Sequence, residues 1–314
     1  MSIIFDEKSF YSSIELYDQI KINNEIPLEK VDFVLNTEGM NFLKKHLNHY
    51  GGTQFDKELY VKLLKKVLHE KNTNNFEESI ILRSIKKGLD NTEFYINNFK
   101  KLNIKKITEN AFQKAKLYLP FNEDKEEDIK LYLLYGIRGT AIILENEIAI
   151  DIVDDYLEEN GEINEAAFIE MLAHELHHIF FQKFLTKQLK NTIDIKEKNK
   201  IQFIGELLSE GTATFYFTNP YRMNDLTKEV WGNNLNNFDN LFEEVKKVLE
   251  QVSNIETPIK EETWHLYDDN LIGYTVGYVM VKTIDETFGK EKVLECIKNH
   301  TNFFDFYNNA IIQK

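Results

Sequence analysis

The chain has 314 residues, of which 42% are hydrophobic and 29% charged, as is ordinary for a globular protein long enough to bury a core. Its 38 Lys and Arg against 52 Asp and Glu give a net charge of −14, which repels phosphate backbones and argues against nucleic-acid binding. No apolar run is long enough for a membrane helix, and the acidic N-terminus is unlike a signal peptide. The single cysteine, Cys296, excludes an intrachain disulfide and fits a reducing compartment, so we expect a cytoplasmic protein.

Residues 6 to about 118 are expected to form an array of helices. Apolar residues recur there at helical spacing, first at Phe10, Ile14 and Tyr17 and then in several later segments. We therefore assign residues 1–118 to a helical N-terminal region, and its pattern indicates no function.

The pattern changes after Pro120. An acidic run, residues 122–128, is expected to form a loop. Three short β-prone runs follow, at Leu131–Tyr135, Ala141–Leu144 and Ile148–Val153. They predict a small sheet within residues 129–153, in which the last two strands form a hairpin.

The next element, a helix over residues 164–185, carries the sequence H-E-x-x-H. Asn164 is a suitable N-cap for it. His174 and His178 are four residues apart, so both imidazoles lie on one face and can bind one metal ion. Glu175 leans toward the same space and can take a proton from a metal-bound water. His177 points elsewhere, and we expect a partly buried histidine or one that supports a ligand.

A following helix, residues 195–217, carries two acids four residues apart. Glu206 and Glu210 share one face, and either is a candidate for a third metal ligand. The sequence around Glu210 favours it, and Gly211 is expected to let this helix approach the 164–185 helix closely.

The rest of the chain is expected to be helical. Helices are predicted at Phe238–Val252, Leu271–Phe288 and Lys290–Asn299, with a short terminal one near Phe303–Ile312. Tyr274 and Tyr278 share a face of the second of these helices. Aromatic residues so placed serve either as core or as part of a site.

Two motifs together resemble a known group of enzymes. His174-Glu175-Leu176-His177-His178, with Ser209 to Ala213 (SEGTA), resembles the gluzincin zinc peptidases, and within them the uncharacterised bacterial families of predicted zinc-dependent peptidases. The segment YLLYGIRGTAIILENEIAIDI and the late Gly273 to Tyr278 segment add weaker likeness. The resemblance covers about residues 119–290. It implies an α+β, predominantly helical fold, with a zincin-like core in residues 119–314 and the small sheet packed on the metal-site helix.

The resemblance also implies roles for individual residues. One Zn²⁺ per chain would be bound by His174, His178 and Glu210, with Glu175 as general base in the hydrolysis of a peptide or protein substrate. A thermolysin-like template would instead place Glu206 on the zinc. The gap between the two motifs is expected to hold a polar loop at residues 187–200.

A peptidase of this kind also needs a donor to the oxyanion of the intermediate and a strand that holds the substrate. Tyr274 is the expected donor to the oxyanion, with Tyr278 and His265 as alternatives. The strand Ile148–Val153 is the expected edge for an extended substrate.

Two other functions remain open at this stage. A zinc-containing regulatory or binding protein without turnover would use the same ligands, although two histidines and one carboxylate leave an open metal position that favours catalysis. A metallohydrolase acting on a non-peptide substrate is the other. The sequence indicates neither the substrate nor the oligomeric state.

Overall fold

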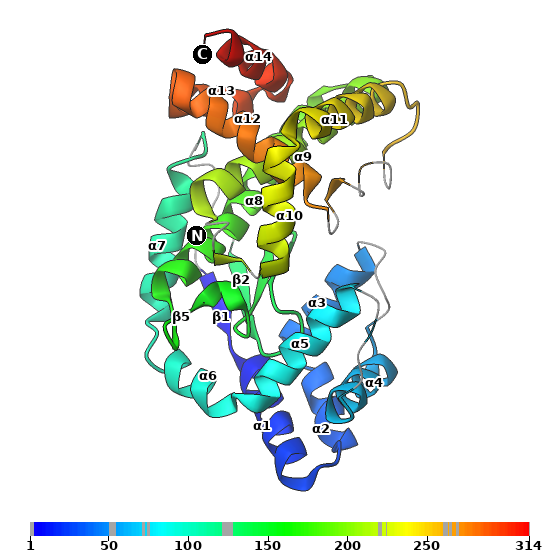
Figure 1. The fold of residues 1–314 in the computed structure, drawn as a ribbon, viewed down its shortest axis with the longest axis vertical. Helices are drawn as coiled ribbons and strands as arrows, with labels where there is room; N and C mark the ends of the chain where they lie inside the picture. Colours follow the sequence, from blue (N-terminus) through cyan, green and yellow to red (C-terminus); the bar gives the residue numbers. More distant parts are fainter. Residues whose placement is uncertain are drawn as a thin grey trace. The chain divides into compact units, whose positions relative to one another are not determined.

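The computed structural model describes residues 3–49, 55–70, 73, 76–120, 128–218, 222–223, 225–259, 263, 266–267 and 270–313. The fold is α+β and predominantly helical, as predicted (Figure 1). The chain forms two compact units. The first comprises Met1–Thr108 and Glu123–Ile169, and the second Glu109–Asn122 and Glu170–Lys314. The predicted domain boundary at residue 118 stays a prediction.

The first unit combines helices with a small sheet. Its elements are β1 (Ile3–Asp6), α1 (Lys8–Asn23), α2 (Leu28–Leu35), α3 (Glu38–His49), α4 (Lys57–Leu68), α5 (Phe76–Asp90), α6 (Thr92–Phe99), β2 (Ile129–Leu134), β3 (Ala141–Leu144), β4 (Glu147–Asp151), η1 (Asp155–Leu157), β5 (Glu158–Glu159) and β6 (Glu162–Ile163). The helix α7 (Ile104–Lys116) runs from this unit into the second.

The main sheet has the strand order β1-β2-β4-β3. The predicted hairpin of β3 and β4 is confirmed, and β2 pairs in parallel with both β4 and β1. The strand β1 was not predicted, because it has only four residues and its pairing partner lies more than 120 positions later. The interior strand β2 is almost continuously buried, as is typical of a strand paired on both sides.

The sheet contradicts the expectation that Ile148–Val153 forms a free edge. Its strand, β4, hydrogen-bonds to β2 on one side and to β3 on the other. Both rows of backbone groups in β4 are therefore used, and an extended substrate cannot add to it. The hairpin pairs one side of β4 with β3, and the other side of β4 pairs in parallel with β2, a pairing that the sequence pattern did not indicate.

Aromatic side chains form the core against this sheet. Tyr135, which follows β2, is fully buried, and its ring contacts those of Phe10, Tyr17 and Tyr95 at centroid distances of 5.4, 5.6 and 5.5 Å. The Tyr135 hydroxyl donates to the carbonyl of Gly88 at 2.7 Å, so the buried phenol is satisfied. These contacts attach α1, α5 and α6 to the end of the central strand.

A buried carboxylate organises the loop between β2 and β3. Asp151 is fully buried at the end of β4. Five backbone N–H groups donate to its two oxygens at 2.7–3.0 Å, those of Gly136, Ile137, Arg138, Gly139 and Val153. The Ser84 hydroxyl of α5 adds a sixth bond at 3.1 Å. Gly136 and Gly139 have φ angles of 61° and 68°, which other residues rarely adopt, so the glycines let the loop curl around the carboxylate.

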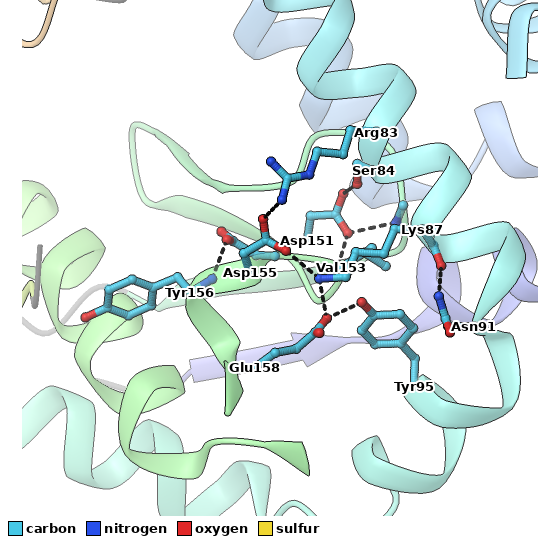
Figure 2. Close-up of polar contacts among 12 residues, drawn as sticks. Arg83, Ser84, Lys87, Asn91, Tyr95, Asp151, Val153, Asp155, Tyr156 and Glu158 are labelled. Atoms are coloured by element: carbon cyan, nitrogen blue, oxygen red, sulfur yellow. Dashed lines mark hydrogen bonds and ion pairs between the residues drawn. The ribbon is translucent and has the colours of Figure 1, made fainter. Parts of the chain in front are cut away.

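Beside this loop, an ion cluster ties α5 and α6 to the chain that leads into the next long helix (Figure 2). Lys87 lies between Asp155 and Glu158, with Nζ–O distances of 2.6 and 2.7 Å. Arg83 also pairs with Asp155, and the Tyr95 hydroxyl donates to Glu158. The cluster is partly buried, so it is less screened than a surface pair and fixes the path of η1 and β5.

The second unit is helical. After α8 (Glu165–Asn191), which begins in the first unit, it contains α9 (Ile195–Phe217), α10 (Asp225–Asn236), α11 (Phe238–Val252), α12 (Ile272–Phe288), α13 (Lys290–Lys298), η4 (His300–Asn302) and α14 (Phe303–Gln313). The predicted polar loop over residues 187–200 is wrong, since only three residues separate α8 from α9. The lysines there lie on helix surfaces, and Asp194 caps α9 by accepting from Glu197 N at 2.9 Å.

The helices α9 and α12 cross at two glycines. A Cβ atom on Gly211 would lie 2.4 Å from the backbone of Gly277, and one on Gly277 would lie 2.4 Å from the carbonyl oxygen of Leu207. The two backbones therefore touch, which only glycine permits. The expectation that Gly211 serves an approach to the metal-site helix α8 is wrong, because its Cα faces α12 instead.

Among the described residues, no helix has both the length and the apolar character needed to cross a membrane.

Candidate metal centre

Two histidines of α8 face one point in the second unit. The helix starts as predicted, with the Asn164 side chain accepting a hydrogen bond from Ala167 N at 3.0 Å. One side of the helix is held by Leu172, Ala173 and Leu176, all fully buried. His174 and His178 point away from these residues, and their Nε2 atoms lie 3.0 Å apart. The predicted sharing of one face by the two imidazoles is confirmed.

The helix α9 brings a carboxylate to the same point. Glu210 Oε2 lies 3.3 Å from His178 Nε2 and 3.8 Å from His174 Nε2. Ligand atoms of these three residues lie within 4.8 Å of one another, the one such group of possible metal ligands found in the described part of the chain. Glu206 is not part of this group. Its side chain accepts instead from Gln202 Nε2 at 3.0 Å on the same helix.

Hydroxyl groups orient both imidazoles. The Nδ1 atom of His174 lies 2.8 Å from Thr218 Oγ1, and that of His178 lies 2.9 Å from Ser209 Oγ. Hydrogen bonds at Nδ1 fix each ring and leave Nε2 for the shared point. Neither hydroxyl was predicted as a partner of a histidine. Ser209 had a signal, since it precedes Glu210 in the second motif, whereas Thr218 lies 44 positions from His174 and had none.

The three groups fit a tetrahedrally bound zinc ion. Donor atoms at about 2.0–2.2 Å from a common zinc lie roughly 3.3–3.5 Å apart in a tetrahedron, close to the three separations here. The buried Oε2 atom of Glu210 has no hydrogen-bond partner among the described residues, so it has an acceptor position for a cation. His-His-Glu is also a ligand set that zinc uses when it keeps a fourth position open.

The electrostatics of the group favour a cation too. Burial, assisted by the charge of His178, lowers the pKa of His174 to about 3, so its imidazole is neutral, as a metal ligand must be. Burial also lowers the pKa of His178, but the Glu210 carboxylate outweighs this and holds it above the ordinary value. The Glu210 carboxylate thus stabilises a positive charge on the His178 side, here that of a bound proton.

Glu175 lies beside this group and is not one of its members. Burial raises the pKa of Glu175 to about 7, with Glu210 adding to the increase and His178 opposing it. A carboxyl group with a pKa near neutrality both accepts and returns protons under physiological conditions. Its neighbour His177 is completely buried, with its ring 5.7 Å from that of Phe181 and 5.6 Å from that of Phe217, so it belongs to the core.

The tyrosines named by the sequence occupy different places. Tyr274 is partly buried in the first turn of α12, and its ring lies edge-on to Tyr267 at 5.9 Å. Tyr278 packs instead against Trp231 and Phe215. His265 lies outside the described residues. The structure draws attention to Tyr267, a residue for which the sequence had no signal, because its hydroxyl is buried without a hydrogen-bond partner among the described residues.

Comparison with known proteins adds one match. No curated protein and no solved structure matches the chain. A family model described as "Putative zinc dependent peptidase (DUF5700)" matches residues 31–314, which include all the residues of the candidate metal centre. Since the match spans most of the chain, the protein belongs to this family.

Proposed function

We propose that the protein is a metallopeptidase of the gluzincin type, in which His174, His178 and Glu210 bind one zinc ion. The observation that supports this most directly is the convergence of the two Nε2 atoms and Glu210 Oε2, with the Nδ1 atoms held by Ser209 and Thr218. When bound, zinc supplies a Lewis acid that polarises the substrate carbonyl and acidifies a water. The zincin-like character of the fold belongs to the same proposal.

Glu175 performs the proton transfers. Its carboxylate accepts a proton from the attacking water and passes it to the amine that leaves. Burial raises the pKa of Glu175, which makes its carboxylate a stronger base than an exposed one, and the group stays beside the metal for the second transfer. Tyr274, at the start of α12, donates a hydrogen bond to the oxyanion of the intermediate.

The substrate is a peptide or protein, as the family description indicates. A fixed cationic site with an adjacent proton acceptor also suits other hydrolyses, and a binding protein without turnover would retain the three ligands alone. The feature that separates an enzyme from a binding protein is Glu175, since metal binding does not require it. A cytoplasmic location remains our proposal, based on the single buried cysteine.

The test compares Glu175→Gln with wild type and with Glu165→Gln, a change to a partly exposed acid in the first turn of the same helix. Zinc content is measured first, and we expect about one ion per chain in all three proteins. A mixed peptide library with mass-spectrometric detection then identifies cleaved peptides. Glu175→Gln should lower turnover by about 10²–10⁴-fold, while Glu165→Gln keeps it. Full-length protein that binds no zinc, or cleavage that survives in Glu175→Gln, would refute the proposal.

A further inference from the structure

One face of α9 carries a line of polar residues toward the metal group. Gln202, Glu206 and Glu210 follow at successive turns, and all three are partly exposed. The residues between them, such as Phe203, Leu207 and Leu208, are buried in the unit. The polar line is thus the open side of the helix, and Glu206 lies one turn from the proposed ligand.

Glu206 is a carboxylate without a counter-ion. Its contact among the described residues is the amide of Gln202, a neutral donor. Burial raises the pKa of Glu206 to about 7, and the negative charge of Glu210 adds to this. A half-buried charge held by one neutral hydrogen bond is costly, and proteins keep such groups where a ligand completes them.

The hydroxyl of Tyr267 is a second polar group, near Glu206, and it lacks a hydrogen-bond partner in the described part of the chain. Its hydroxyl oxygen is buried and makes no hydrogen bond to any described residue. The ring is seated against Gly273, where an added Cβ would lie 2.4 Å from a ring carbon, so the position of the phenol depends on that glycine. One turn further along α12, Gly277 meets the carbonyl oxygen of Leu207, the residue next to Glu206, so the phenol lies near the polar line of α9. Burial raises the pKa of Tyr267 well above its ordinary value, and the charges of Glu206 and Glu210 add to the increase.

The Glu206 carboxyl has one neutral hydrogen-bond donor, and the buried Tyr267 hydroxyl has no hydrogen-bond partner among the described residues, so both oxygens have acceptor positions to fill. We infer that Glu206 and the Tyr267 hydroxyl form a subsite for an ammonium group of the peptide substrate, an inference that rests on the proposed function. An ammonium group donates three hydrogen bonds and accepts none, so it suits a carboxylate and a phenol oxygen that lack donors.

The spacing favours the free N-terminus as the source of this ammonium group. Residues four apart on a helix are separated by about 6 Å. In a peptide, the α-nitrogen lies about 3 Å from the carbonyl oxygen of its own residue, and a charge-assisted hydrogen bond adds about 2.8 Å. A carbonyl polarised beside Glu210 would therefore place the ammonium group of the first residue near Glu206. The side chain of a lysine is the other source of the same chemistry.

The experiment measures binding and cleavage separately. Four hexapeptide libraries of uncharged composition differ only in whether the N-terminus is free or acetylated and whether one internal lysine is free or acetylated. Binding to the zinc-loaded Glu175→Gln protein is measured by equilibrium dialysis with mass-spectrometric detection. Cleavage of the same libraries is then measured with protein that retains Glu175. We expect at least about a tenfold preference for the free N-terminus in both measurements.

Substitutions then locate the preference. Glu206→Gln is nearly isosteric and should abolish the preference, and Tyr267→Phe should reduce it by roughly 3–10-fold. Glu197→Gln, which changes a partly exposed acid in the first turn of the same helix, should keep it. A preference that follows free lysine would identify the side chain as the ammonium source.

The possible failures are distinguishable. Ammonium-dependent binding that requires Glu206 supports the subsite even if no peptide is cleaved, in which case the proposed function fails alone. Equal binding of all four libraries, binding of none, or a preference that survives in Glu206→Gln overturns the inference. Cleavage without an ammonium preference also overturns the inference and leaves the proposed function standing.

Discussion

Substitution of Glu210 and of Glu206 should have different effects on zinc affinity. Among the described residues, Glu210 is the acid whose oxygen faces both imidazoles, whereas Glu206 accepts from Gln202 one turn away. Glu210→Gln should therefore lose most of the zinc affinity, because an amide is a poor ligand and leaves the ion's charge unmatched. Glu206→Gln should change affinity by no more than roughly 10–100-fold, as for groups outside the ligand set.

Competition with a coloured zinc chelator measures both affinities, and Ser209→Ala provides an intermediate case. Loss of the Ser209 hydroxyl leaves His178 free to rotate without removing a ligand, so we expect affinity between the other two. Should Glu206→Gln bind zinc more weakly than Glu210→Gln, the two glutamates would exchange roles.

At the scale of elements, the crossing of α9 and α12 is the contact most sensitive to a single methyl group. Gly211→Ala places a Cβ 2.4 Å from backbone atoms of Gly277, so the helices must separate. We expect a loss of about 1–3 kcal/mol in the free energy of unfolding, from overpacking. Glu210 adjoins this crossing, so zinc affinity should fall as well.

Gly232→Ala is the matched control for the crossing. This glycine lies inside α10, and nothing is within 4 Å of the position its Cβ would take. The change should stabilise the protein by about 0.5–1 kcal/mol through helix propensity. Denaturant unfolding of the two variants measures both effects. Equal effects of both substitutions would show that helix propensity, and not the crossing, decides the outcome at Gly211.

Local patterns predicted features that depend on neighbouring residues well. The hairpin of β3 and β4, the Asn164 cap and the shared face of His174 and His178 each depend on residues within a few positions of one another. The features that were missed or mistaken depend on distant partners. They include the pairing of β1 with β2, the packing of Gly211 on α12 and the contact of Thr218 with His174. No periodicity within a segment carries information about which other segment will cover it.

At the scale of the whole molecule, bound zinc should act as a source of stability. A ligand that binds the folded chain at a thousand times its dissociation constant contributes about 4 kcal/mol. Removal of zinc by a chelator should then lower Tm by roughly 5–15 °C, and added zinc should restore it. Scanning calorimetry measures this shift. A shift of the same size in Glu210→Gln would place the stabilising ion elsewhere in the chain.

The loop around Asp151 has a consequence for how this part of the chain can move. Loops whose successive N–H groups point inward usually bind an anion from solution, and the concentration of that anion sets how often the loop is occupied. Here the anion is the Asp151 carboxylate, which is attached to β4. Its effective concentration is therefore constant, and a dissolved anion competes poorly with it. Release of this single carboxylate would free five amides at once. We therefore expect the four loop amides of residues 136–139 to lose their hydrogen bonds together rather than one at a time, because they share one acceptor.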